Sequence, residues 1–179
     1  MTRGLLLLDV DGPLNPYAAN RYRRPPGYLT YRRTATGWHS GRDARRYKGL
    51  RVWLNPSHGA QLLALAAMTS LELVWATTWQ HEANERIAPA VGLPALPVIE
   101  FPGYTLTTGW DDAWKWPAVA AYAKDRPLAW LDDEHERSGA AEFARQRAGT
   151  PTLLCHVDPR QGLGSAHLAQ VRRWAGSLA

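Results

Sequence analysis

Two aspartates separated by one residue, Asp9 and Asp11, follow directly on four consecutive leucines near the start of the chain. An unbroken apolar run of this length is typical of a central strand of a parallel sheet, buried on both faces. Side chains alternate along a strand, so both carboxylates are expected on one side, about 7 Å apart. Gly12 and Pro13 end the strand, which places the acids at the carboxyl edge of the sheet, where ligands of such sheets bind. A hard cation such as Mg²⁺ would offset the cost of burying both charges.

A second apolar segment, residues 71–76, ends in the hydroxyl pair Thr77 and Thr78, and the residues from Gln80 to Glu85 favour a helix. A threonine between a strand and a helix offers its hydroxyl and backbone N–H groups to an anion. The alternative is that both threonines only cap the helix, which is a frequent use of this residue.

Lys115 is one of three lysines in a chain that contains eighteen arginines. It precedes a helix expected over 117–123, with Pro117 in its first turn. A compact ammonium can neutralise a phosphoryl oxygen and a nucleophilic carboxylate together. The alternative is a solvated surface lysine between Trp114 and Trp116.

A third apolar segment, residues 128–131, ends in Asp132 and Asp133. Adjacent side chains of a strand face opposite ways, so both acids reach one metal only if the strand has already turned. We therefore expect Asp132 as a ligand, with Asp133 bonding directly or through water. Alternatively, these acids and Glu134 only favour the start of a following helix.

In this order, the four sites resemble the motifs of the haloacid dehalogenase (HAD) superfamily of phosphohydrolases. The resemblance implies a nucleophile, Asp9, and a general acid and base, Asp11. It implies a phosphoryl site of Lys115 with Thr77 or Thr78, and Mg²⁺ held by Asp9, the backbone carbonyl of Asp11, Asp132 and Asp133. The opening Asp-x-Asp-Gly-x-Leu-Asn and the Trp after the second motif also resemble phosphatase domains that accompany RNA repair enzymes.

An arginine- and tyrosine-rich insertion is expected over residues 15–55. From Arg21 to Arg51 the chain has ten basic residues and one acidic one, a net +9, whereas the whole chain carries +5. Five of the seven tyrosines lie at or near it: Tyr17, Tyr22, Tyr28, Tyr31 and Tyr47. In the resembling superfamily, cap elements lie between the first two motifs, and guanidinium groups and aromatic rings suit phosphates and bases. We take Arg23, Arg24, Arg45 and Arg46 as candidate substrate-binding residues; the alternative is a solvated basic surface.

The rest of the chain alternates short apolar segments with helix-forming ones, as in 152–157 and 166–174, and a further short strand is expected over 96–99. This pattern predicts a single α/β domain over 1–179, Rossmann-like, with a mostly parallel sheet and helices on both faces. A length of 179 residues suits one domain with its own core. One cysteine, Cys155, and the lack of a long apolar span or signal sequence favour a cytoplasmic protein without a membrane segment.

These patterns predict a Mg²⁺-dependent phosphatase that acts through an aspartyl-phosphate on a phosphorylated RNA or DNA end or a nucleotide. Two alternatives stay open: a non-catalytic nucleic-acid-binding module on the same fold, and a phosphatase or phosphotransferase acting on a small metabolite. The residues leave the oligomeric state open.

Overall fold

A four-stranded parallel sheet forms the centre of the protein. The computed structural model describes residues 3–101, 114–135 and 140–178. The strands are β1 (Leu5–Leu8), β5 (Glu72–Trp75), β6 (Leu128–Asp132) and β7 (Thr152–His156), in the order β5-β1-β6-β7. β1 pairs in parallel with β5 on one side and with β6 on the other, which confirms its predicted central position.

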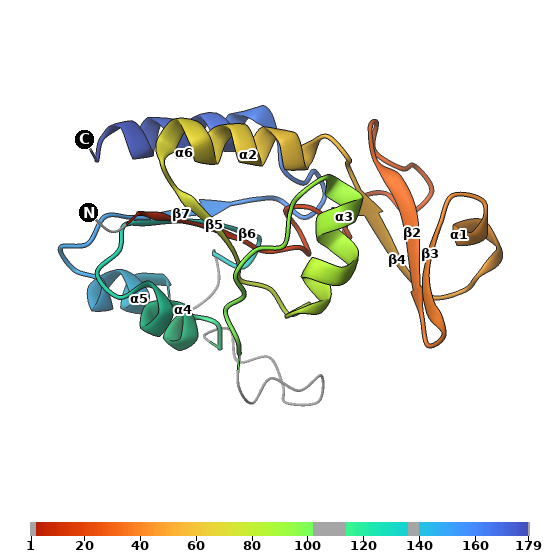
Figure 1. Ribbon diagram of the computed structural model, residues 1–179, viewed down its shortest axis with the longest axis horizontal. Helices are drawn as coiled ribbons and strands as arrows, with labels where there is room; N and C mark the ends of the chain where they lie inside the picture. Colours follow the sequence, from red (N-terminus) through yellow and green to blue (C-terminus); the bar gives the residue numbers. More distant parts are fainter. Residues whose placement is uncertain (1–2, 102–113, 136–139, 179) are drawn as a thin grey trace.

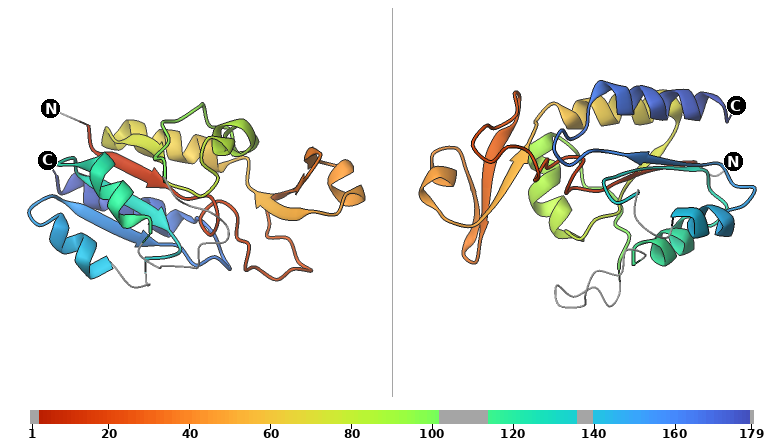
Figure 2. Two further views of the ribbon diagram at one scale, coloured as in Figure 1. Left: turned by 90° about the horizontal axis from the view of Figure 1, so that it is seen from below. Right: turned by 180° about the vertical axis from the view of Figure 1, so that it is seen from behind.

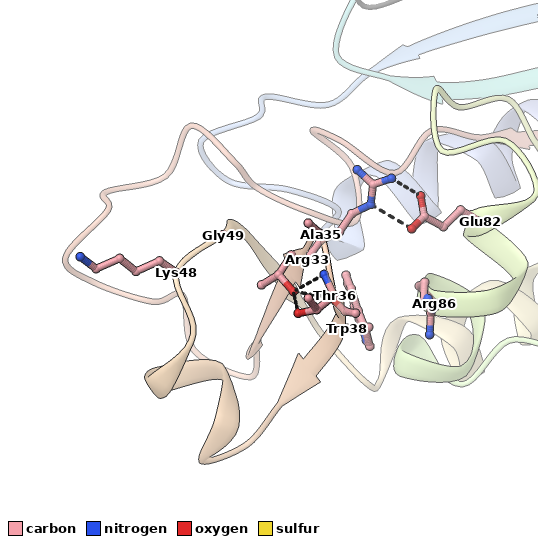
Figure 3. A pocket seen from close by; sticks show the side chains of 10 residues that line it. Arg33, Ala35, Thr36, Trp38, Lys48, Gly49, Glu82 and Arg86 are labelled. Carbon is pink, nitrogen blue, oxygen red and sulfur yellow. Dashed lines mark hydrogen bonds and ion pairs between the residues drawn. The ribbon is translucent and has the colours of Figure 1, made fainter.

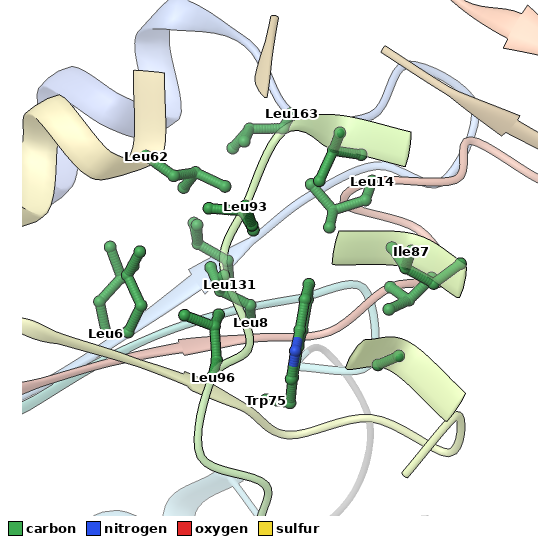
Figure 4. Close-up of a cluster of buried hydrophobic side chains, with 14 of the residues drawn as sticks. Leu6, Leu8, Leu14, Leu62, Trp75, Ile87, Leu93, Leu96, Leu131 and Leu163 are labelled. Carbon is green, nitrogen blue, oxygen red and sulfur yellow. The ribbon is translucent and has the colours of Figure 1, made fainter. Parts of the chain in front are cut away.

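Helices cover both faces of this sheet. α2 (His58–Thr69) and α6 (Ser165–Gly176) lie on one face, and α4 (Trp116–Ala123) and α5 (Ala140–Gln146) on the other (Figure 1). The four leucines of β1 alternate between the two faces because side chains of a strand do so. Leu6 and Leu8 pack in a cluster with Leu62 of α2 (Figure 4), whereas Leu5 and Leu7 join the cluster on the opposite face. This arrangement confirms the predicted α/β fold.

The segment between β1 and α2 forms a small antiparallel sheet. Its elements are β2 (Leu29–Thr34), β3 (Gly37–Ser40), the short helix α1 (Asp43–Arg46) and β4 (Leu50–Leu54), with the strands in the order β3-β2-β4. It projects beyond the carboxyl ends of the parallel strands, and α1 lies at its far end (Figures 1 and 2). Val52 and Leu54 are fully buried in the cluster that also holds Leu6, so β4 anchors this sheet to the core.

Two local expectations differ from the structure. The expected helix after Thr77 begins later, because backbone bonds from Gln80 to Thr77 and from Glu82 to Trp79 first close consecutive turns. Helical structure then starts as the π-helix η1 (Ala83–Ile87) and continues as α3 (Ala88–Val91). The segment 96–99, expected as a strand, forms only a single bridge between Val98 and Trp75.

None of the helices in the described parts of the chain combines the length and the apolar character needed to cross a bilayer.

Candidate active site

The register of the parallel sheet brings three segments to one edge. Leu8 is opposite both Trp75 and Leu131, so the residues that follow these positions emerge side by side. The Asp9 N–H donates to the Leu131 carbonyl at 3.0 Å and continues this register beyond β1. Asp9 therefore lies beside Asp132, the last residue of β6.

Three carboxylates form a tight group at this edge. One oxygen each from Asp9, Asp132 and Asp133 lies within 4.8 Å of the other two. The chain turns directly after β6, and Asp132 Oδ1 accepts the N–H of Glu134 at 2.8 Å, which satisfies the condition that both adjacent acids face one site. Gly12 makes room for them: its φ is +90°, and a Cβ there would lie 2.6 Å from Asp133.

Lys115 lies in the middle of the acids, immediately before α4. Its Nζ is 2.7 Å from Asp9 Oδ2, 2.8 Å from Asp132 Oδ2 and 3.1 Å from Glu134 Oε2. The side chain is 5% exposed, which rules out the solvated surface lysine. Burial acts to lower the pKa of Lys115, but the charges of Asp132, Asp9 and Glu134 outweigh it, and that pKa lies well above its ordinary value. The ammonium is therefore a permanent positive charge at this edge.

One ammonium does not compensate all of these acids. Burial raises the pKa of Asp9 to about 6, and the charge of Asp132 adds to it while Lys115 opposes it. Burial, followed by the charges of Asp9 and Asp132, raises the pKa of Asp133 to about 7. Such shifts indicate a deficit of positive charge. Three converging carboxylate oxygens are donors of the kind that Mg²⁺ prefers, so the residues fit this ion.

Thr77 lies on the opposite side of Asp9 from β6, at the end of β5. Its side chain is fully buried and its hydroxyl donates a hydrogen bond to the Asp9 carboxylate. Its Oγ1 also accepts the N–H of Trp79 at 3.3 Å, within the turn that precedes η1. Thr78, the other candidate, is half-buried. The structure thus brings Thr77 and Lys115 together at Asp9.

Asp11 is oriented differently from the other acids. Its Oδ1 accepts the side-chain amide of Asn15 at 2.7 Å, and its Oδ2 accepts the indole N–H of Trp79 at 2.9 Å. Its carboxylate is not among the three that converge. Burial and the charge of Asp9 raise the pKa of Asp11, while Asn15 and Trp79 act to lower it. Asp11 is therefore held next to the acidic group with both oxygens fixed.

Sequence reasoning missed the two residues that hold Asp11. Asn15 is 2% exposed, and its Oδ1 accepts the backbone N–H of Trp53 in β4 at 3.0 Å. The Trp79 ring meets the edge of Trp38 in β3, with centroids 6.0 Å apart. Both residues belong to the pattern that resembles RNA repair phosphatases, so the sequence contained a signal for them. Asn15 is four residues from Asp11, whereas Trp79 is far from it along the chain. Through them, the antiparallel sheet contacts the residues around Asp11.

Tyr17 and Glu134 were also missed. The Tyr17 hydroxyl donates to Asp133 Oδ2 at 2.9 Å, and Glu134 pairs with Lys115. Only the position of Glu134 directly after the Asp pair could have suggested it.

The four candidate arginines lie on the surface. Arg23 and Arg24 are exposed in the segment before β2, and Arg45 and Arg46 are exposed on α1. α1 is at the end of the molecule farthest from the parallel sheet (Figure 2). Two of the tyrosines expected to face a ligand, Tyr28 and Tyr31, are instead buried, at 6% and 9% exposure. Their rings pack inside the protein and are not available to stack on bases.

A comparison with known families agrees with this site. The profile of a family described as HAD domain in Swiss Army Knife RNA repair proteins matches residues 5–168. No curated protein and no solved structure gives a significant match. The matched region contains Lys115 and the ends of β1, β5 and β6, which carry the acids and Thr77. The chain belongs to the family of HAD domains found in Swiss Army Knife RNA repair proteins.

Proposed function

We propose that this domain is a Mg²⁺-dependent phosphohydrolase that removes a terminal phosphate from a nucleic-acid end through an aspartyl-phosphate. The observation that carries the proposal is the environment of the Asp9 carboxylate. It receives hydrogen bonds from Lys115 and Thr77 and lies against Asp132 and Asp133. A nucleophilic carboxylate, two phosphoryl-binding donors and a set of metal ligands thus share one strand edge.

In the first proposed step, an oxygen of Asp9 attacks phosphorus and the bond between phosphorus and the leaving oxygen breaks. Asp11 gives its proton to that leaving oxygen. In the second step, Asp11 accepts a proton from a water molecule, which attacks phosphorus and releases phosphate from Asp9. The bonds from Asn15 and Trp79 hold Asp11 in place for both transfers.

The phosphoryl group would be bound by Lys115 and Thr77, because both donors already point at Asp9. Asp9, Asp132, Asp133 and the backbone carbonyl of Asp11 would hold Mg²⁺, which supplies charge stabilisation to the transferring group when bound. Lys115 adds a second fixed positive charge on the same oxygens.

Two observations favour a nucleic-acid end as the substrate. The family is found in RNA repair proteins. In addition, the segment from Arg21 to Arg51 carries a net +9, and a concentration of positive charge favours a polyanion over a small ester.

The test is a phosphatase assay with Mg²⁺ over oligonucleotides with 3′- or 5′-phosphates, nucleotides, sugar phosphates and p-nitrophenyl phosphate. We expect phosphate release that stops in EDTA and returns with Mg²⁺ or Mn²⁺, with oligonucleotide ends as the best substrates. Asp132→Asn should lose this activity, whereas Asp43→Asn, which changes an exposed acid of the insertion, should keep it. Full activity after thorough chelation would contradict the metal site. A preference for sugar phosphates would contradict the substrate class.

A further inference from the structure

A groove separates the β2–β3 hairpin from η1. Its volume is about 680 Å³, within the range of about 300–1,000 Å³ typical of ligand sites. Arg33, Trp38 and the hairpin turn 34–37 form one wall, Glu82 and Arg86 form the other, and Lys48 with Gly49 lies at one end (Figure 3).

The charge of the groove is positive. Three cations and one acid line it. Arg33 forms a two-point contact with Glu82, with Nη2–Oε2 at 2.7 Å and Nε–Oε1 at 2.9 Å. Arg33 and Glu82 thus neutralise each other. Among the described residues that line the groove, this leaves Arg86 and Lys48 without an acidic partner. Arg86 is on η1 across from the hairpin, whereas the Lys48 side chain extends outward from the far end (Figure 3). Two separated cations suit successive phosphates of a chain better than a single phosphate group.

The groove also contains a rigid aromatic surface. Trp38 is half-buried and is stacked on Tyr31, with centroids 5.1 Å apart and an interplanar angle of 19°. Its edge contact with Trp79 fixes it from a second side. An indole ring held in this way can accept a base without further ordering, and base stacking tolerates any sequence.

The groove is close to the proposed reacting atoms. Trp38 lines it and contacts Trp79, whose indole N–H donates to Asp11. The rings of Trp38 and Trp79 therefore connect the groove to Asp11. A substrate whose terminal phosphate lies at Asp9 has a path into the groove only if it continues as a chain.

We propose that this groove binds the single-stranded nucleotides adjoining the phosphorylated end, with a base against Trp38 and backbone phosphates at Arg86 and Lys48. This inference deepens the proposed function and relies on it for the position of the terminal phosphate. It locates strand binding at the hairpin and η1 rather than at the arginines of α1, which lie at the far end of the insertion.

The test measures the affinity of the full-length protein for a short fluorescent RNA oligonucleotide that has no terminal phosphate, by anisotropy in EDTA over a range of salt concentrations. We expect Trp38→Leu to weaken binding about tenfold, since it removes one stacked base. Arg86→Glu and Lys48→Glu should each reduce the dependence of log Kd on log salt concentration by about one. Arg45→Glu is the matched control, because it makes the same change of charge on α1 and should leave binding close to that of the wild type.

Two outcomes separate this inference from the proposed function. If Arg86→Glu and Lys48→Glu bind no more weakly than Arg45→Glu, the groove is not the strand site, whatever the phosphatase assay shows. If both groove variants lose RNA binding but the wild type hydrolyses no phosphate ester, the groove assignment holds and the phosphatase proposal fails.

Discussion

The carboxyl edge of the parallel sheet and the antiparallel insertion differ in burial and in charge. At the edge, Asp9, Asp132 and Lys115 are buried, and the Lys115 ammonium bonds to both carboxylates. In the insertion, most basic side chains are exposed. Burial fixes geometry because an unpaired buried charge is very unfavourable, whereas an exposed arginine is stabilised by water in many positions. The edge therefore holds its charged atoms in fixed positions, as the proposed chemistry requires, whereas the exposed charges of the insertion can adapt to the large anion that we propose as its partner.

The two regions are nevertheless joined around one residue. Asn15 connects Asp11 to β4, and Trp79 connects Asp11 to β3 through Trp38. A change at this junction should affect the chemistry without touching the acids that converge on Asp9. On our proposal, the insertion has two separable contributions, one to strand binding and one to the position of Asp11.

The largest difference between the regions should appear in stability. Lys115→Met removes the partner of buried acids, and breaking a buried ion pair costs about 3–5 kcal/mol. Arg33→Met breaks the half-exposed pair with Glu82, and such pairs contribute about 0–1 kcal/mol. Urea unfolding of both variants in EDTA measures this contrast. Addition of Mg²⁺ should restore part of the stability of Lys115→Met, because a cation would bind the same acids. Equal losses of unfolding free energy in Lys115→Met and Arg33→Met would contradict this difference between the buried and the half-exposed ion pairs.

A smaller effect, on rate alone, is expected at the junction. Trp79→Phe keeps an aromatic ring but removes the N–H that donates to Asp11. A hydrogen bond to a charged group contributes about 1.5–3 kcal/mol, so kcat should fall about ten- to a hundredfold, with little change in KM for p-nitrophenyl phosphate. Trp174→Phe, on α6, is the matched control and should retain the wild-type kcat. A rise in KM with unchanged kcat would indicate that Trp79 binds substrate instead.

The smallest effect concerns the pH dependence of stability. His58, at the start of α2, meets the ring of Tyr28 edge-on at 5.5 Å. Burial lowers the pKa of His58 from 6.5 to about 4. The unfolded state therefore binds more protons in this interval, and stability falls as the pH drops from about 6.5 towards 4.

His58→Leu should therefore show a shallower loss of thermal stability in this interval, by a few degrees. Part of the loss should persist, because burial also lowers the pKa of His135 to about 4. If His58→Leu loses as much thermal stability between pH 6.5 and 4 as the wild type, protonation of His58 does not cause that loss.

The edge of the sheet could be predicted from sequence because its signals are local. Each of its three acid- or hydroxyl-bearing segments follows a short apolar run, and parallel strands end at the same edge. Asp9, Thr77 and Asp132 are therefore found at the positions that this logic assigns. Lys115 was assigned from its place before a helix and from the family resemblance, and it lies immediately before α4. The sequence indicated that Asp133 joins this group only if the chain turns directly after the strand, but it did not predict that turn. The turn is accompanied by a hydrogen bond from the Glu134 N–H to the Asp132 side chain.

For the insertion, the sequence predicted the residue content and the charge, but not which side chains are buried or what they contact. Its charge was evident, but the sequence did not distinguish buried Tyr31 from exposed Tyr22, because strand pairing decides which side faces the core. The groove likewise depends on Arg86, which lies far along the chain from Trp38 and outside the basic segment. Trp79 was not assigned for the same reason, because it meets Asp11 and Trp38 only in the folded chain. Asn15 lies near Asp11 in sequence, but its contact with Trp53 of β4 is long-range.

The central claim is that Asp9 becomes phosphorylated, and the most direct measurement is acid quenching of the Asp11→Asn variant during turnover of p-nitrophenyl phosphate. This ester has a good leaving group, so its first step needs little help from an acid, whereas the second step still needs a base. We predict a burst of p-nitrophenol close to the enzyme concentration, a steady rate about 10²–10⁴-fold below the wild type, and phosphate on the peptide that contains Asp9. Asp9→Asn should give neither burst nor phosphopeptide. Turnover by a folded Asp9→Asn variant, or quenched Asp11→Asn protein without phosphate on Asp9, would contradict the account.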